Sequence, residues 1–322
     1  MTYRKLAQLI GVSPSTVSKV LSGSGEISED TAVLVRKAAA EYGVVRPKYH
    51  RTHKSKRVTV IVPEIVSVYY STMATMIADY LSKRGFETSI MICGFEHERF
   101  FELFDIIVNE KLADGIISFE SCEVTHKSEI PVIFLGSSEN KRCDSVEFDV
   151  ESGIDDAVKH LISLGHRHIG YIGEKNTTAK LDYFKNVMVR NGLTFSPRDC
   201  FVSSQRFEMI GVEGAEYFVK SRNCPTAFLA AYDEVAFGAI HTFGQYGKRV
   251  PEDISIIGIN DIPSSAYAQI PLTTIRTFSD EMVTAAADLL IKKIESEEPC
   301  AVQKIKLCCD LIIRDTTAPK NN

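Results

Sequence analysis

Residues 6–23 of this 322-residue chain read LAQLIGVSPSTVSKVLSG, and the stretch predicts two short helices. Its first apolar residues recur at helical spacing and stop at Gly11, a residue type that commonly ends a helix. Ser13 can then cap a second helix, with Pro14 at its first position, where proline loses no hydrogen bond. Two short helices joined by a turn that contains glycine describe a helix-turn-helix.

The second of these helices has one apolar and one polar side. Its apolar residues form an inner stripe, which leaves small hydroxyl residues and Lys19 on the outside. Short side chains let a helix sit deep in the major groove of DNA, where Lys19 can reach a guanine edge or a phosphate. A third helix is expected after Ser28, with Val33 and Leu34 among the residues that cover the first two.

The charge of the chain is distributed unevenly. Residues 1–57 hold 11 Lys and Arg but only four acids, a net charge of +7, whereas the remaining residues sum to −12. A basic head on an acidic body is typical of a polyanion-binding module, although a solvated basic face would give the same count. Residues 44–57 hold six bases and no acid, so they are too polar to bury much and are predicted to be a linker.

The head resembles that of the LacI/GalR family of bacterial transcription regulators, on the pattern Gly-Val-Ser-x-x-Thr-Val-Ser-x-Val-Leu near the N-terminus. The resemblance implies sequence-specific binding to double-stranded DNA. The residues that it places at base-reading positions are Pro14, Ser15 and Lys19. The residues that it places near the DNA backbone are Tyr3, Ser13, Thr16, Ser18 and Ser22. Because proline has no side-chain donor, Pro14 can offer only apolar contact, for example to a thymine methyl group.

The linker departs from the family pattern, in which a leucine wedges into a central minor-groove step. Arg46 and Pro47 are kept, but Lys54 stands at the wedge position and no alanine remains to favour a helix. Arg51 and Lys54 can hold phosphates, but they cannot unstack bases as leucine does. We therefore expect weaker kinking of the DNA, or a hinge that orders through charge alone.

After residue 57, strand-like apolar runs alternate with amphipathic helical stretches. The expected strands are residues 58–63, 88–93, 115–119, 132–135, 169–172, 227–231 and 254–259. This alternation predicts an α/β body of doubly wound parallel sheets with helices on both faces. The run is too long for one ordinary sheet, and a break near residues 145–153 divides it into two lobes.

The resemblance extends through the body and implies a two-lobed fold like that of periplasmic binding proteins, most clearly at residues 233–239 and 249–258. The expected domains are a head at 1–45, a basic hinge linker at 46–57 and an effector-binding and dimerisation body at 58–322. Lobe 1 is expected at about 58–147 and 277–306, and lobe 2 at about 150–275 and 309–322. Three strands then cross between the lobes near 147–150, 275–279 and 306–310. Ligand is expected in the cleft between the lobes, outside the carboxyl ends of the strands.

The resemblance also supplies candidate effector-binding residues. These are Tyr69, Tyr70, Phe148, Lys180, Tyr232, Asp233 and Asn260. Flat rings and a few polar groups suit a polyhydroxylated ligand, and the resemblance to the family implies a sugar. Other roles stay open: the two tyrosines can cover a dimer or lobe surface, Asp233 can cap a helix, and Lys180 can be a solvated helix-start residue.

Three positions make this cleft less acidic, or less able to form bidentate bonds, than a typical sugar site of the family. Lys180 replaces an arginine and so lacks its planar fork. Gly136 stands where many members carry an acid, and Asn260 replaces another acid.

Other classes of function find no support in the sequence. The eight cysteines form no CxxC pair, and His166 and His168 lack a third ligand nearby, so we expect no metal and no cofactor. No dinucleotide fingerprint, Walker A loop or nucleophile elbow occurs, so we expect no enzyme. No apolar run is long enough for a membrane span, and the absence of a signal-peptide core predicts a cytoplasmic protein.

The sequence therefore predicts a homodimeric repressor that binds a pseudo-palindromic operator and responds to a small ligand, with a higher oligomer left open. Two alternatives remain at this stage. One is a regulator controlled by a phosphorylated carrier protein that docks on lobe 1. The other is a small-molecule binding protein whose DNA head is non-functional.

Overall fold

The computed structural model divides into two compact units, Met1–Lys54 and Ser55–Asn322. The residues that it describes are 3–21, 27–42, 55–120, 130–136 and 142–321. Ser22, Arg51 and Lys54, which the sequence placed on the DNA, lie outside these residues, as does most of the predicted linker.

The first unit is a small bundle of three helices, in agreement with the predicted helix-turn-helix. They are α1 (Tyr3–Ile10), α2 (Pro14–Leu21) and α3 (Glu29–Glu41). Leu6 of α1 and Val17 of α2 are fully buried, and Gly11 takes the left-handed conformation in the turn between the two helices. The expectation for Val33 and Leu34 was wrong: both are about half exposed, and Val35 is the buried residue of α3 in their place.

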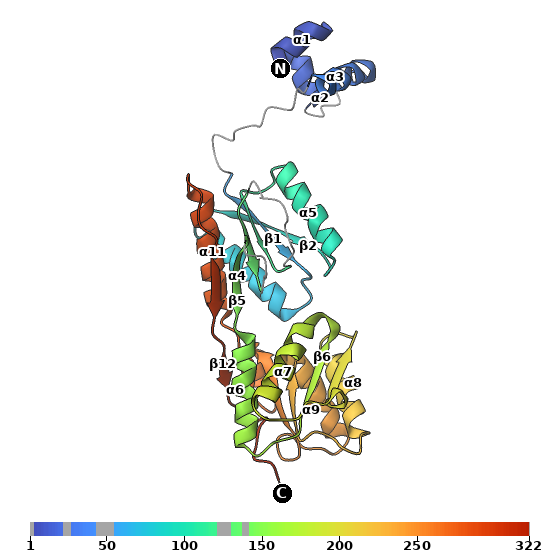
Figure 1. The fold of residues 1–322 in the computed structure, drawn as a ribbon, viewed down its shortest axis with the longest axis vertical. Helices are drawn as coiled ribbons and strands as arrows, with labels where there is room; N and C mark the ends of the chain where they lie inside the picture. The colour runs from blue at the N-terminus through green and yellow to red at the C-terminus, as the bar shows by residue number, and fades with distance from the viewer. Residues whose placement is uncertain (1–2, 22–26, 43–54, 121–129, 137–141, 322) are drawn as a thin grey trace. The chain divides into compact units, whose positions relative to one another are not determined.

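The second unit contains two six-stranded sheets, drawn in Figure 1. The first sheet has the order β11-β5-β4-β3-β1-β2, and its strands are β1 (Arg57–Val62), β2 (Glu87–Ile92), β3 (Gly115–Ser118), β4 (Val132–Leu135), β5 (Asp144–Phe148) and β11 (Lys304–Leu307). The second has the order β12-β10-β9-β8-β6-β7, and its strands are β6 (Ile169–Glu174), β7 (Cys200–Ser203), β8 (Ala227–Ala230), β9 (Ser255–Asn260), β10 (Thr274–Arg276) and β12 (Asp310–Ile312). All neighbouring strands are parallel except β10 and β12.

Helices cover these sheets, and the predicted α/β architecture is confirmed. Lobe 1 denotes the first sheet with α4 (Val68–Ser82), α5 (His97–Asn109) and α11 (Ser279–Glu295). Lobe 2 denotes the second sheet with α6 (Val150–Ser163), α7 (Thr178–Arg190), α8 (Glu208–Val219), α9 (Asp233–Gln245), α10 (Ser264–Tyr267) and two short 3₁₀ turns at Lys175–Thr177 and Pro197–Asp199. In lobe 1, Val60 packs with α4 and α11, whereas the next residue, Ile61, packs with α5. Successive strand residues thus serve two apolar cores, one on each face of the sheet.

The chain passes between the two sheets three times. It leaves lobe 1 between β5 and α6, returns between β10 and α11, and leaves again between β11 and β12. The stretch 145–153, expected to be a break, therefore contains most of strand β5 as well as the first crossing. Short strands with alternating exposure, such as β11, give no long apolar run, which is why the periodicity missed them.

Two glycines allow α8 and α9 to pack with their backbones in contact. A Cβ on Gly238 of α9 would collide with the Glu208 carbonyl oxygen, and a Cβ on Gly211 of α8 would collide with that of Val235. No side chain can move aside there, because the opposing atoms belong to helix backbones. The pairing of α8 and α9 over the second sheet therefore requires glycine at both positions.

Gly238→Ala should destabilise the protein by about 3 kcal/mol, because overpacking against backbone forces the two helices apart. Gly244→Ala, in the same helix, is the matched control, since its added methyl group meets nothing within 4 Å. It should be neutral or stabilise by up to about 1 kcal/mol through helix propensity. Urea unfolding followed by circular dichroism measures both. Equal effects of the two substitutions would contradict the proposed backbone contact.

Candidate functional site

The exposed start of α2 carries a cluster of hydroxyl groups. The Ser13 hydroxyl accepts the Thr16 backbone N–H at 3.0 Å, so Ser13 caps the helix. The same oxygen lies 2.8 Å from the hydroxyls of Ser15 and Thr16. Ser13, Pro14 and Ser15 at this end are exposed, as is Lys19 in the last turn of α2, so this side of the helix can approach a partner closely. Tyr3 lies in α1 and Ser18 in α2.

An aromatic cluster lines the side of lobe 1 that faces lobe 2. Tyr69 and Tyr70 begin α4, with their rings 5.3 Å apart. Tyr70 also contacts Phe119 at the end of β3 and Phe95 after β2, at 5.4 and 6.1 Å between ring centroids. Burial raises the pKa of both tyrosines, so their hydroxyls stay protonated.

Tyr69 also lines a cavity of about 210 Å³ at the junction of the lobes. Lobe 1 contributes the start of α4 and of α11, and lobe 2 contributes Asn260 and Arg276. Asn260 adopts φ 110°, so β9 ends in a conformation that L-residues rarely take. Tyr69 and Asn260, two of the sequence candidates, thus line one cavity.

Lys180 and Tyr232 lie together in lobe 2. The Lys180 ammonium donates to the Ala231 carbonyl at 2.8 Å and lies 5.9 Å from the centroid of the Tyr232 ring. Burial disfavours the charged form and lowers the pKa of Lys180 to about 8, although Glu174 opposes the shift. The Tyr232 hydroxyl accepts the Phe207 backbone N–H at 3.0 Å. Lys180 is therefore held in place, and not a freely solvated helix-start residue.

Phe148 ends β5 at the first crossing and packs against the apolar cores of both lobes. Phe148 therefore lies at the junction of the two lobes, the position of a hinge residue.

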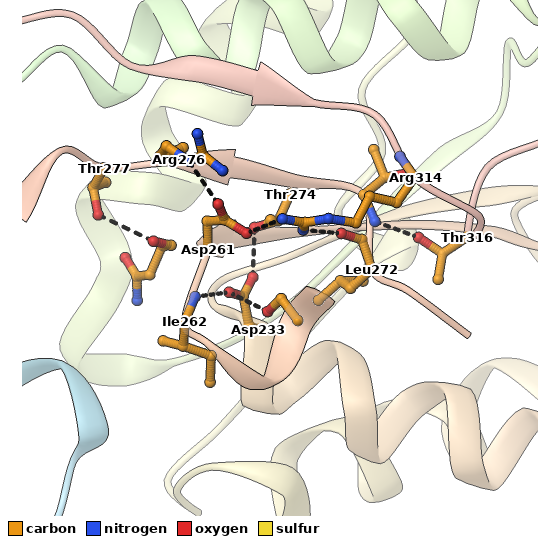
Figure 2. Close-up of polar contacts among 12 residues, drawn as sticks. Asp233, Asp261, Ile262, Leu272, Thr274, Arg276, Thr277, Arg314 and Thr316 are labelled. Atoms are coloured by element: carbon orange, nitrogen blue, oxygen red, sulfur yellow. Dashed lines mark hydrogen bonds and ion pairs between the residues drawn. The ribbon is translucent and has the colours of Figure 1, made fainter. Parts of the chain in front are cut away.

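The structure corrects the expectation for Asp233. This carboxylate is fully buried in lobe 2, so it does not reach the cleft, and it does not cap its own helix. It accepts hydrogen bonds from the Ile262 backbone N–H and the hydroxyls of Ser265 and Thr274, the first two at 2.8 Å. Figure 2 shows Asp233 beside Ile262, with the hydrogen bond between them drawn as a dashed line. Burial raises the pKa of Asp233 to about 7, while its three donors oppose the shift.

Asp261, which the sequence reasoning missed, ties the end of β10 to the segment that follows β12. One carboxylate oxygen lies 2.6 Å from Nε of Arg276, the last residue of β10, and the other lies 2.7 Å from a guanidinium nitrogen of Arg314, just after β12. Figure 2 shows Asp261 between these arginines. Asp261 and Arg314 are mostly buried, at 7 and 16% side-chain exposure, so solvent screens the pair little.

A second group that the sequence reasoning missed joins the lobes directly. Arg206, after β7, pairs with Glu64, after β1, and with Glu174 at the end of β6. The signal was available: all three residues stand at carboxyl ends of parallel strands, the edges that meet at the cleft.

Among the residues that the structure describes, no group of three His, Cys, Asp or Glu side chains could hold a metal ion. His166 bonds Thr226, Ser255 and the Ala318 carbonyl, and His168 bonds Asp199. Nor does any helix in these parts of the chain have the length and apolar character to cross a membrane.

Two family models match the chain. "Bacterial regulatory proteins, lacI family" matches residues 2–46, and "Periplasmic binding protein-like domain" matches residues 158–317. The chain therefore joins a DNA-binding domain of the lacI family to a periplasmic-binding-protein-like domain. It is therefore a DNA-binding transcription regulator.

Known transcription regulators match most or nearly all of the chain. The HTH-type transcriptional repressor PurR of Glaesserella parasuis is 26% identical over 342 residues, with 99% of each protein covered. A lac repressor dimer bound to operator and the anti-inducer ONPF superposes with a TM-score of 0.75 at 22% identity, with 99% of each chain covered. A LacI family transcriptional regulator from Enterococcus faecium with bound ribose gives 0.71 at 28% identity, covering 82% of this chain and all of that one.

Asp261→Asn should destabilise the two-lobed body by about 2 to 4 kcal/mol, because it leaves two arginines without their shared negative charge. Asp182→Asn is the matched control: Asp182 pairs with Lys185 at 2.8 Å but is 64% exposed. Its loss should change stability by less than about 0.5 kcal/mol. Urea unfolding of the full-length protein measures both free energies of unfolding. An unchanged free energy for Asp261→Asn would contradict the stabilising role of Asp261.

Proposed function

We propose that this protein is a repressor whose affinity for operator DNA changes when a small ligand binds between the lobes of its body. The observation that carries the proposal is the combination of a helix-turn-helix with a two-lobed body whose lobes meet at an aromatic and charged cleft. Closure of the lobes on a ligand would be a population shift between two conformations rather than a chemical step. No catalytic step is part of the proposal.

The proposed partner of the head is a pseudo-palindromic operator. The residues proposed to read bases are Pro14, Ser15 and Lys19, and those proposed near the DNA backbone are Tyr3, Ser13, Thr16, Ser18, Ser22, Arg51 and Lys54. One short helix reads only about four base pairs, so two heads of a homodimer are needed for specificity. Because operator DNA is its target, we propose that the protein acts in the cytoplasm.

The proposed effector is a sugar or a similar polyhydroxylated molecule. Tyr69 and Tyr70 offer ring faces to C–H groups, and Lys180, Tyr232 and Asn260 offer polar groups to hydroxyls. Phe148 would follow lobe closure at the hinge, and Asp233 would act indirectly, by holding the segment after Asn260. The ribose-bound relative from Enterococcus faecium supports this class of ligand.

Selection of duplexes from a random pool by the full-length protein, at fixed physiological salt, should recover a short inverted repeat. Salt must be fixed because phosphate contacts make affinity strongly salt-dependent. Lys19→Ala should weaken binding to that repeat by about 5- to 150-fold if Lys19 reads a base. Lys220→Ala, an exposed lysine of the body paired with Glu216, is the control and should bind normally. Recovery of unrelated duplexes alone would contradict a sequence-reading head.

Calorimetric titration of pentoses and hexoses into the full-length protein should find at least one that binds. Its affinity should fall between about pH 7 and pH 9, because Lys180 has a pKa of about 8 and loses its charge and one donor as the pH rises through that value. Lys180→Met should bind more weakly and lack this decline. The bound sugar should also change operator affinity. Silence of every sugar would contradict the ligand class, and binding without an effect on operator affinity would contradict the switch.

A further inference from the structure

The Arg206 guanidinium lies in a cage made by both lobes. Its two terminal nitrogens lie 2.7 and 3.1 Å from the two carboxylate oxygens of Glu64, a bidentate pair. Its Nε lies 2.6 Å from Glu174. Phe95 and Phe207 contact the guanidinium, with ring centroids 5.0 and 4.8 Å from its central carbon. Planar pairing and ring stacking together suit arginine and not lysine.

The cage spans the cleft. Glu64 and Phe95 follow strands β1 and β2 of lobe 1, whereas Glu174, Arg206 and Phe207 belong to lobe 2. The bidentate pair therefore joins the lobes without any ligand. Separation of the lobes would break both of its hydrogen bonds and withdraw the Phe95 ring from the guanidinium.

The backbone on both sides of the cage is strained. Phe95 adopts φ 62° and Phe207 adopts φ 57°, the left-handed region that bulky residues rarely occupy. Such conformations persist only where the surroundings determine them, and they concentrate at binding and switch sites. Each lobe thus holds one phenylalanine in an unfavourable conformation where it meets Arg206.

Water competes weakly for these charges. Glu174 is only 4% exposed, and Glu64 and Arg206 are 19 and 26% exposed. Burial raises the pKa of Glu174, an effect that the charge of Arg206 opposes. A charged pair in such surroundings is stronger than a surface ion pair, and the loss of one partner leaves the other buried and unpaired.

We propose that Arg206 is an interlobe latch, with Glu64 as its partner on lobe 1, and that the pair sets how far the cleft is closed before ligand binds. The latch adjoins the proposed ligand site, because Tyr70 lies in the electrostatic field of Arg206, Glu64 and Glu174. A ligand that takes both terminal nitrogens of Arg206 in the same bidentate way must displace Glu64. Arg206 and Glu64 are thus positioning residues for the switch. The meaning of the latch for regulation rests on the proposed function, but its existence does not.

The test measures lobe separation in the full-length protein without ligand or DNA. An unnatural amino acid that carries a spin label replaces Glu110 of lobe 1 and Arg222 of lobe 2, both of which are exposed. The labelled chain is diluted with unlabelled protein, so that labels on different chains contribute little. Pulsed electron resonance then gives the distance between the two labels within one chain. Glu64→Gln should raise the ratio of long to short distances about tenfold, which corresponds to about 1.4 kcal/mol.

Glu102→Gln is the matched control, because it also removes a lobe 1 acid paired with an arginine, Arg99, at 2.7 Å, but within one helix. It should leave the distances unchanged. Arg206→Met should open the lobes like Glu64→Gln, and the double variant should open them no further, whereas Arg206→Lys should restore part of the closure. Melting temperatures confirm that each variant folds.

Unchanged distances in a folded Glu64→Gln protein, or additive effects in the double variant, would overturn the latch. Neither result bears on ligand-switched DNA binding, because operator and sugar titrations test that function separately. Conversely, an intact latch in a protein that binds no sugar would leave the latch established and the ligand class wrong.

Discussion

The shared carboxylate of Asp261 is the constraint on which the geometry of the body depends. Arg276 ends β10, just before the second crossing, and Arg314 follows β12, the strand that the third crossing enters. Asp261 holds these two arginines together. Asp233 accepts a hydrogen bond from the next residue, Ile262, so a fully buried acid fixes the segment that carries Asp261. The positive φ angles of Asn260 and Asp261 show that this segment takes a shape imposed by its bonds.

These ties divide the body into fixed and adjustable parts. Within each lobe, apolar cores and glycine-mediated contacts such as Gly238 against α8 leave no room for small displacements. Between the lobes, the contacts described here are polar or aromatic, and a charged pair can be exchanged for bonds to water or ligand. Motion is therefore expected about the crossings and not inside the lobes, as two-state closure requires.

The sequence predicts the features that rest on long periodic patterns. The first two helices of the head, and strands such as β1 and β9, bury continuous apolar residues and were found within one or two positions. Short or half-exposed strands such as β11 carry no such signal, because tertiary pairing alone makes them strands. Val33 and Leu34 were wrongly predicted to be buried, because three successive apolar residues of α3 look alike in the sequence. Only packing against α1 and α2 determines that Val35 is the one that is buried.

The site was predicted least well where residues act in pairs from distant parts of the sequence. Resemblance to a family points to single positions, such as Lys180 where the family usually has an arginine. It does not show that Arg206, after β7, supplies a guanidinium to the cleft. The Lys180 ammonium has three donors, of which the Ala231 carbonyl takes one, whereas the fork of Arg206 is already engaged by Glu64. A ligand therefore meets one ammonium with further donors and one guanidinium whose bidentate fork is already paired with Glu64. That difference is how occupancy of the cleft can be coupled to closure of the lobes.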